Sequence, residues 1–348
     1  MNKLPGLSSG FFGHRQVRLL TGLLMVASGL PVLAQTSIAN HGPVRLNVVA
    51  VDSAGRPVPD LTAADFAVFD NGSPQQIASL RLDQSDKPRP VVILFDLLNS
   101  GEASRGAVWN AIKTSLARTS FAGPLYLYLL AEDGSLYPVH PLPAARGAPA
   151  AEGSADASWT KDIGPLMDAA MQKVTQVRPQ DVRAVSPVHL QARFTETYHA
   201  LDDLRALMAA SRGPKELLWI TYGIPNEIQF WDHTWFYGTP PLRQLGARFV
   251  QSGITVYSAD PGMNLDRGIL NRDSLDVLTG ATGGRAFSTI DLNRAIDRIE
   301  AASRTNYSIE YQPAPTNWDG KYHKLHVTVA RKGVHLQTEI GYYAGTGS

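Results

Sequence analysis

Apolar residues follow a strand-like pattern near the beginning of the chain. They alternate with polar residues from Val44 to Asp52, and Asn71-Gly72 stands between two further short apolar runs. Alternation is typical of a strand with one solvated face, and Asn-Gly is a strong signal for a tight hairpin turn. We therefore predict a β-rich segment over residues 43–85.

A second region, residues 88–304, combines short apolar runs with stretches of helical period, such as Val108, Ile112 and Leu116. The apolar runs show little alternation, which is typical of strands that are covered on both faces. The pattern predicts an α/β domain. Its expected strands are Val91 to Phe95, Leu125 to Leu130, Glu216 to Thr221, Ile254 to Ser258 and Arg285 to Phe287. Within it, residues 144–158 are rich in Ala, Gly, Pro and Ser, and we expect a flexible insertion.

The last segment, residues 305–348, returns to strand patterns, and it could pack with residues 43–85 because chain ends are often close together. His323 and His326 lie three residues apart on one expected strand. They should point to opposite faces, so they do not form a metal-binding pair, and we expect them at the surface. The expected strands are Asn306 to Tyr311, Tyr322 to Arg331 and Val334 to Tyr343.

The first 34 residues have the features of a secretory signal peptide. Basic Lys3, Arg15 and Arg18 precede an apolar run from Leu19 to Leu33, and Ala34 offers a small residue for cleavage. The alternative is an uncleaved anchor, but a membrane span needs roughly 20 apolar residues. We expect a secreted or periplasmic protein without a stable membrane anchor after cleavage.

Composition narrows the possible chemistry. The chain has no cysteine, which excludes disulfides, thiolate metal sites and a cysteine nucleophile. The signal segment holds three of the 32 basic residues and none of the 31 acidic ones, so the remaining chain is slightly acidic. This charge gives no electrostatic reason to expect nucleic acid or an anionic membrane as a partner.

Several short motifs carry a resemblance to a known family. They are F-D-L-L-N-S ending at Ser100, R-F-T-E-T-Y-H-A-L from Arg193, I-T-Y-G ending at Gly223 and I-T-V-Y-S-A-D ending at Asp260. In this layout the chain resembles a von Willebrand factor A domain. More narrowly, it is similar to the secreted VWFA-related proteins of acidobacterial type, whose flanking motifs match L-T-A-A-D-F-A-V-F-D-N-G before the domain and T-G-G-R-A-F behind it.

The resemblance implies a doubly wound, mostly parallel α/β sheet of the von Willebrand A or Rossmann-like kind, with β-rich segments on both sides. It also implies a metal-ion-dependent adhesion site built from D-x-S-x-S, a later Thr and the Asp of a T-D-G. Asp96, Ser100 and Thr195 match that pattern, whereas Leu98 and Tyr222 break it. One carboxylate and two hydroxyls would hold Mg²⁺ or another divalent cation only weakly.

Asp96 also has a structural interpretation. It ends an apolar run and precedes a helix, where backbone N–H groups and the positive end of the helix dipole can satisfy a carboxylate. Under this interpretation Asp96 is an acid in a turn and binds no ion.

Aromatic residues gather in the connection that follows Gly223. They are Phe230, Trp231, Trp235, Phe236 and Tyr237. Large aromatic side chains on a loop at a ligand-binding edge are enriched at interface hot spots, so we predict that they contact a partner. The alternative is that they close over the end of the core.

No recognisable catalytic signature accompanies these features. Ser100 lies in N-S-G instead of G-x-S-x-G, and the chain has no H-E-x-x-H and no phosphate-binding loop motif. We therefore predict a non-catalytic binding or adhesion module that recognises a protein or cell-envelope partner. The alternative is a metal-dependent, hydrolase-like enzyme that uses the crevice at Asp96.

Overall fold

The computed structural model describes residues 42–84, 89–121, 123–143, 159–160, 163–175, 186–211, 213–261, 273–288 and 292–345. Residues 39–348 make one compact unit. The predicted signal peptide and the predicted insertion at 144–158 lie outside the described residues. Within the described ranges, no helix is long and apolar enough to span a membrane.

The chain has a mixed α/β structure with several sheets, and the largest is a mostly parallel sheet of six strands. Its strands follow the order β12, β11, β8, β5, β6, β7, and only the edge strand β7 is antiparallel to its neighbour. Along the chain, β5, β6 and β7 therefore lead from the centre of the sheet to one edge, and β8, β11 and β12 lead from the centre to the other edge. The bounds are β5 Val91–Asp96, β6 Leu125–Leu130, β7 Leu136–His140, β8 Lys215–Ile220, β11 Ile254–Asp260 and β12 Ala286–Ser288.

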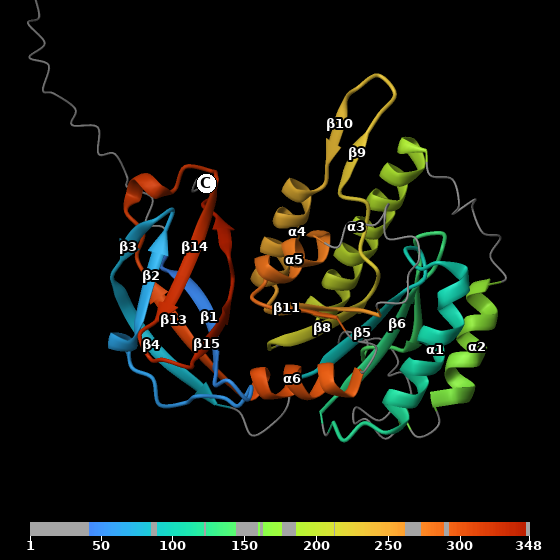
Figure 1. Cartoon of the computed structure of the whole chain (residues 1–348), viewed down its shortest axis with the longest axis horizontal. Coiled ribbons are helices and arrows are strands. Elements are labelled where there is room, and N and C mark those ends of the chain that lie inside the picture. Colours follow the sequence, from blue (N-terminus) through green and yellow to red (C-terminus); the bar gives the residue numbers. More distant parts are fainter. Residues whose placement is uncertain are drawn as a thin grey trace, which may run out of the picture. The chain divides into compact units, whose positions relative to one another are not determined.

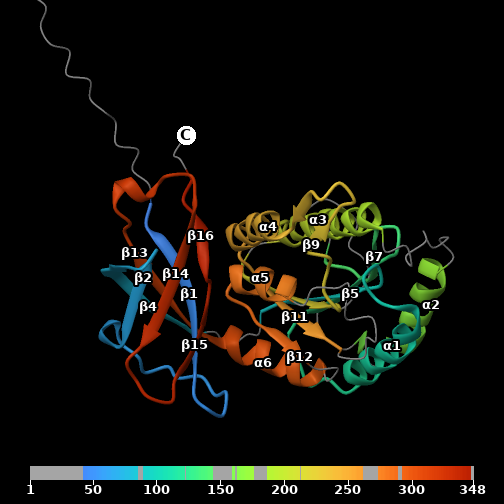
Figure 2. The same ribbon diagram turned by 45° about the horizontal axis from the view of Figure 1, so that its top comes forward.

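Helices cover both faces of this sheet (Figures 1 and 2). Successive residues of β5 point to opposite sides: Ile93 and Phe95 pack with α1, α2 and α6, whereas Val92 and Leu94 pack with α3, α4 and α5. This two-sided burial is the reason for the unbroken apolar runs in the sequence. The helices are α1 Glu102–Ala117, α2 Ile163–Thr175, α3 Pro187–Ala209, α4 Thr239–Gln251, α5 Asp273–Ala281 and α6 Leu292–Arg304.

Strands from both ends of the chain form two four-stranded antiparallel sheets (Figure 1). In one sheet β1 lies between β15 and β13, and in the other β2 lies between β14 and β3. Their facing side chains, including Val48, Val68 and Ile309, form one apolar core. The bounds are β1 Val44–Val51, β2 Phe66–Asp70, β3 Ser73–Gln75, β4 Ile77–Gln84, β13 Thr305–Tyr311, β14 Tyr322–Val329, β15 His335–Thr338 and β16 Gly341–Tyr343, with short 3₁₀ turns at Ala63–Asp65 and Pro315–Asn317.

Two sequence expectations in this β module can be checked directly. Asn71 and Gly72 join β2 to β3 with positive φ angles of 47° and 82°, as the Asn-Gly hairpin signal predicts. The strand expected from Val334 to Tyr343 is instead divided. Its first part joins one sheet and its last part joins the other, because the chain crosses between the sheets at Glu339 and Ile340, where the Ile340 amide donates to the Gly280 carbonyl.

The surface position expected for His323 is wrong. His326 is exposed, as alternation requires, but His323 is buried between two carboxylates, with Nδ1 2.7 Å from Asp70 and Nε2 3.2 Å from Asp319. The hydroxyls of Tyr311 and Tyr342 also donate to Asp70. A histidine occupies this inward position because the β module places a polar group within hydrogen-bond distance of each ring nitrogen.

Candidate functional site

Asp96 ends β5 at the carboxyl edge of the six-stranded sheet, and its side chain is fully buried. Four groups donate to its carboxylate: the Asn99 amide N–H at 2.9 Å, Asn99 Nδ2 at 2.8 Å, Thr221 Oγ1 at 2.8 Å and Trp219 Nε1 at 3.2 Å. An ionised carboxylate offers about four lone-pair sites. Three of these donors contact Oδ2 and one contacts Oδ1, so the protein's own donors occupy most of the acceptor capacity of Asp96.

A positively charged side chain of the protein, Arg193, also lies near the Asp96 carboxylate. Burial raises the pKa of the Asp96 carboxyl, whereas the hydrogen bonds from Asn99 and Thr221 and the nearby Arg193 guanidinium lower it. Burial lowers the pKa of Arg193, and the charge of Asp96 acts in the opposite direction. Arg193 thus supplies a positive charge close to the carboxylate.

Asn99 joins these two charged residues. Its Oδ1 accepts from Arg193 Nη2 at 3.2 Å, and its Nδ2 donates to Asp96 and, at 2.9 Å, to Thr197 Oγ1. Every polar atom of this side-chain amide has a partner, which fixes its orientation. These hydrogen bonds join four buried residues to the half-buried Arg193 in one network, which we call the Asp96 network: Asp96, Asn99, Arg193, Thr197 and Thr221.

Of the residues expected to hold a metal, the structure brings only two together. Ser100 is buried beside Asp96, but its hydroxyl donates to the Asp96 backbone carbonyl and so closes the turn. Thr195 lies on the exposed side of α3, where its hydroxyl donates to the Gln191 carbonyl at 2.9 Å. Thr197 takes the inward position instead, because two residues along a helix differ by about 200° in direction.

The two residues that break the adhesion motif are part of the core. Leu98 packs in the cluster on the α3 side of the sheet, and Tyr222 packs in the cluster on the other side. Both are almost fully buried. The polar ligands that a metal site would need at these positions are replaced by side chains that close the end of the sheet.

The donor set around Asp96 does not fit Mg²⁺. This ion takes six oxygen ligands in near-octahedral geometry, whereas the groups that contact the Asp96 carboxylate are hydrogen-bond donors. Within the ranges that the structure describes, no group of three or more His, Cys, Asp or Glu residues is arranged to hold a metal ion. Thr195 lies on the exposed side of α3, so the structure does not bring it together with Asp96 and Ser100.

The aromatic connection forms a β-hairpin with two distinct faces. Its strands, β9 Glu227–Gln229 and β10 Trp235–Tyr237, pair antiparallel. Directly paired residues share a face, so Ile228 and Phe236 point to one side and Glu227, Gln229, Trp235 and Tyr237 to the other. We call the first group the inner face and the second the outer face.

The inner face anchors the hairpin to α3. Ile228 is buried, and the Phe236 ring meets the Phe194 ring edge to face at a centroid distance of 4.8 Å. At the base of the hairpin, the Gly238 amide donates to the Asn226 carbonyl at 2.7 Å. A Cβ on Gly238 would lie only 2.4 Å from the Phe194 ring, so the close approach of hairpin and helix requires glycine.

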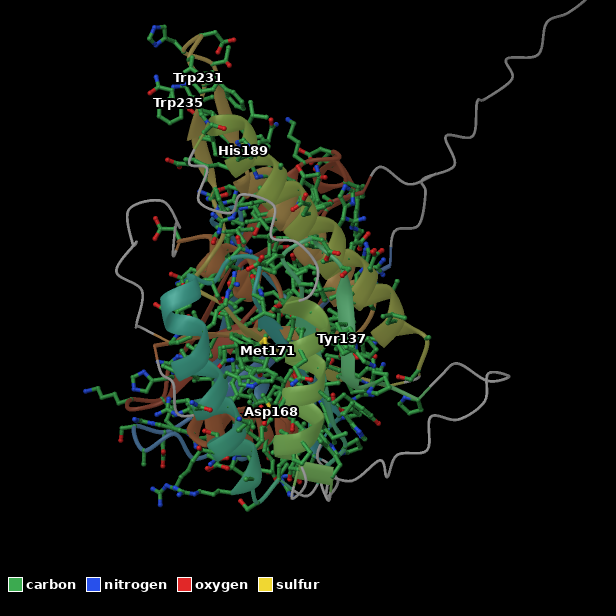
Figure 3. The ribbon with its side chains drawn as sticks, turned by 90° about the vertical axis from the view of Figure 1, so that its right-hand side faces the viewer. Tyr137, Asp168, Met171, His189, Trp231 and Trp235 are labelled. Atoms are coloured by element: carbon green, nitrogen blue, oxygen red, sulfur yellow. The ribbon has the colours of Figure 1, made fainter. Side chains whose placement is uncertain are left out.

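The outer face and the turn carry the exposed aromatic side chains. Trp231, Trp235 and Tyr237 are 75%, 48% and 56% exposed. Trp231 and Trp235 lie toward the end of the hairpin (Figure 3). The five predicted aromatic residues are thus divided: three are exposed, Phe236 packs on the core and Phe230 is half-buried.

The turn between the two strands is well ordered by hydrogen bonds. The Phe230 amide donates to the Thr234 carbonyl at 2.8 Å, and Asp232 Oδ1 accepts from both the amide and the hydroxyl of Thr234. His233 has a φ of 65°, a conformation uncommon for a residue other than glycine. The exposed rings are therefore carried by a defined hairpin.

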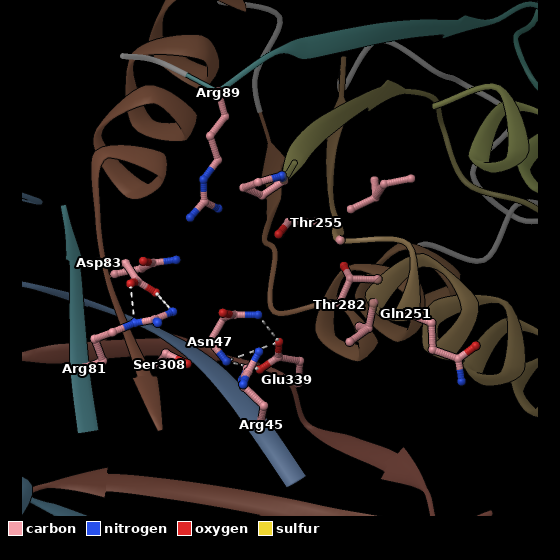
Figure 4. Close-up of a pocket in the computed structure, with 15 residues that line it drawn as sticks. Arg45, Asn47, Arg81, Asp83, Arg89, Gln251, Thr255, Thr282, Ser308 and Glu339 are labelled. Carbon is pink, nitrogen blue, oxygen red and sulfur yellow. Dashed lines mark hydrogen bonds and ion pairs between the residues drawn. The ribbon is translucent and has the colours of Figure 1, made fainter. Parts of the chain in front are cut away.

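A polar cavity of about 370 Å³ was not predicted from the sequence. Its lining includes Asn47 and Glu339, which Figure 4 shows in contact. The Glu339 carboxylate accepts from the Asn47 amide at 3.1 Å, from Asn47 Nδ2 at 3.3 Å and from Thr338 Oγ1 at 3.1 Å. Burial raises the pKa of Glu339 to about 7, so this carboxyl titrates near neutral pH.

Comparisons with known proteins give only weak likenesses. No family model and no curated protein matches the chain. Among solved structures, proximal thread matrix protein 1 from the mussel byssus is 11% identical over 68% of this chain, with a TM-score of 0.36. The chain spans about half the length of that protein, 51%.

Two further solved structures are similar at the same level. The human COPII-coat protein Sec24c is 10% identical over 74% of this chain and 44% of its own, with a TM-score of 0.35. Manganese-loaded TRAP protein from Plasmodium vivax is 12% identical over 75% of this chain and 96% of its own, also with a TM-score of 0.35. At this level the likenesses assign neither a function nor a binding site to the present chain.

Proposed function

We propose that this chain is a secreted, non-catalytic binding module with a von Willebrand A-like domain, in which an aromatic hairpin contacts the partner and no metal ion is needed. The partner is a protein or another component of the cell envelope.

The strand order of the six-stranded sheet supports the von Willebrand A-like, doubly wound assignment. Counted along the chain from β5, the order is 3-2-1-4-5-6, with helices on both faces. In such sheets ligands bind outside the carboxyl ends of the strands, where the order reverses. Here the reversal lies between β5 and β8, and Asp96 ends β5 at that place.

The Asp96 network supports the proposal that Asp96 stabilises the fold and does not bind a metal ion. A metal-dependent adhesion site would need an open coordination position for the partner's acidic group. Asp96 instead holds four donors, and Arg193 provides the positive charge that a cation would provide. The same donor set gives no support to the alternative of a metal-dependent hydrolase-like enzyme.

The observation that carries the proposal is the two-sided construction of the β9–β10 hairpin. Its inner face is held against α3, whereas Trp231, Trp235 and Tyr237 remain exposed in spite of their large apolar area. Exposed large aromatic side chains on a defined scaffold are typical of interface hot spots. Their removal should affect binding far more than folding.

A capture experiment tests this proposal. The purified protein, and a double variant with Trp231→Ala and Trp235→Ala, are crosslinked to a cell-envelope extract under identical conditions. We expect the double variant to lose the specific crosslinked species while its melting temperature stays within about 2 °C of the parent, because exposed side chains contribute little to stability. Unchanged capture by the double variant would refute the proposal.

A further inference from the structure

The outer face of the hairpin combines aromatic rings with one carboxylate. Glu227 lies directly across from Tyr237, and Gln229 lies directly across from Trp235. The Trp235 and Tyr237 rings are nearly parallel, with 16° between their planes and 6.1 Å between their centroids. All four side chains are exposed, and the two rings and the two polar groups lie on the same side of the hairpin.

The charge of this segment is one-sided. Residues 217–242 contain two carboxylates, Glu227 and Asp232, and no Lys or Arg. Asp232 is engaged in the turn by the amide and hydroxyl of Thr234. No ion pair of Glu227 is found among the described residues, and Glu227 pairs with Tyr237 across the hairpin on the same outer face.

Aromatic faces and a carboxylate attract the same kind of group. The face of a Trp or Tyr ring carries negative potential and binds ammonium or guanidinium groups, and a neighbouring carboxylate adds a charge-assisted hydrogen bond. An anionic group would meet repulsion from Glu227 and from both ring faces. The guanidinium of Arg248 over the Tyr198 ring, at 5.4 Å from the centroid, shows the same type of contact elsewhere in this chain.

We propose that the outer face of the hairpin binds a cationic side chain, in the first place arginine, presented by a basic peptide segment of the partner. The guanidinium stacks on Trp235 and Tyr237 and donates to the Glu227 carboxylate. This inference rests on the proposed function and adds the chemical class of the group that is recognised. A planar guanidinium can stack on an aromatic face, whereas the compact ammonium of lysine cannot, so arginine is favoured over lysine.

Isothermal titration calorimetry with defined probes tests the inference. The first probe is a short synthetic peptide with arginine at alternate positions, and the second is the same peptide with citrulline, which has nearly the same shape but no charge. We expect the arginine peptide to bind at least about tenfold more tightly, the difference that a well-placed cation–π contact can provide. Its affinity should fall as salt is raised.

Variants of the full-length protein locate the contact. Trp235→Ala, Tyr237→Ala and Glu227→Gln should each weaken binding of the arginine peptide several-fold. Asp203→Asn is the matched control for Glu227→Gln, since Asp203 is an exposed carboxylate on α3 and its loss changes the net charge equally. The control should bind like the parent. Equal binding of the two peptides, or an equal effect of Glu227→Gln and Asp203→Asn, would overturn the inference.

A third probe, a neutral tetrasaccharide of N-acetylglucosamine, covers the main competing chemistry, because sugar rings also stack on Trp and Tyr. Tighter binding of the tetrasaccharide than of the arginine peptide would overturn the cationic assignment in favour of a glycan. The envelope capture experiment distinguishes failure of the cationic inference from failure of the proposed binding function. If the Trp variants lose capture but the arginine peptide does not bind, only the cationic inference fails, whereas unchanged capture refutes the binding role of the hairpin itself.

Discussion

The Asp96 network and the aromatic hairpin follow neighbouring strands of the same sheet but are built in opposite ways. Asp96 has the residue type expected of a binding site, yet it is buried and its carboxylate accepts from four protein donors. Trp231, Trp235 and Tyr237 have the residue type expected of a core, yet they are exposed. The comparison teaches that residue type alone does not indicate a binding surface. A binding surface is indicated by side chains that the rest of the fold leaves exposed.

The largest effect in this comparison is expected from Asp96→Ala. The change leaves the buried donors of Asn99, Trp219 and Thr221 without their acceptor, together with the nearby Arg193 charge. Removing one member of such a buried charged network costs about 3–5 kcal/mol of unfolding free energy. Urea denaturation measures it. A loss below about 1 kcal/mol would mean that Asp96 is not a structural residue.

The second effect concerns another buried carboxylate, Glu339. Its pKa is about 7 in the folded protein and near the ordinary value of 4.5 in the unfolded chain, so folding favours the protonated form. This contribution to stability is fully present below pH 4.5 and is lost as the pH rises through 7. The parent's unfolding free energy, measured relative to that of Glu339→Gln, should fall by up to about 3 kcal/mol across this range. A difference that does not change with pH contradicts the assignment.

The two faces of the hairpin provide a matched pair of changes. Phe236→Ala removes the ring that packs on Phe194 and should lower the unfolding free energy by about 2 kcal/mol, less than a fully buried Phe because Phe236 is only half-buried. Trp235→Ala, next to it on the outer face, should cost about 0.5 kcal/mol or less. Thermal unfolding of both variants checks the pair. Equal losses would show that the outer face also serves the core.

The smallest effect is expected from divalent cations. A bound ion stabilises the folded state by mass action, and at 100 times its dissociation constant the gain is about 2.7 kcal/mol. Because four protein donors contact the buried Asp96 carboxylate and Thr195 lies on the exposed side of α3, Mg²⁺, Ca²⁺ and Mn²⁺ at millimolar concentration should each leave the melting temperature unchanged within about 1 °C. A rise of several degrees that Asp96→Asn removes would restore the adhesion-site interpretation.

The sequence predicted five of the six strands of the large sheet, including the edge strand β12, but not the edge strand β7 or the strands of the hairpin. The run from Val91 to Phe95 matches β5 to within one residue, because burial on both faces leaves an unbroken apolar pattern. The edge strand β7 and the hairpin strands β9 and β10 were not predicted as strands. The hairpin strands have only three residues each, and most of these are exposed, whereas β7 contains Pro138 and is only partly buried.

The sequence indicated which residues of the candidate site to consider, but not how their side chains are arranged in the fold. Asp96 and the aromatic cluster could be selected from the sequence, since an acid after a buried strand and five large rings in one connection are local features. The partners of Asp96 could not be selected in the same way. Thr221, which donates to Asp96, and Thr197, which accepts from Asn99, are about 100 residues or more away along the chain, and whether a polar group is satisfied depends on folded geometry.

One measurement tests the central claim most directly: capture of the envelope partner by the parent protein and by the Trp231→Ala, Trp235→Ala double variant, each with Mg²⁺ and with excess EDTA. The account predicts that EDTA leaves capture by the parent unchanged and that the double variant fails in both conditions. Capture that EDTA abolishes and that the double variant retains would place recognition at a metal in the Asp96 network and would contradict the account.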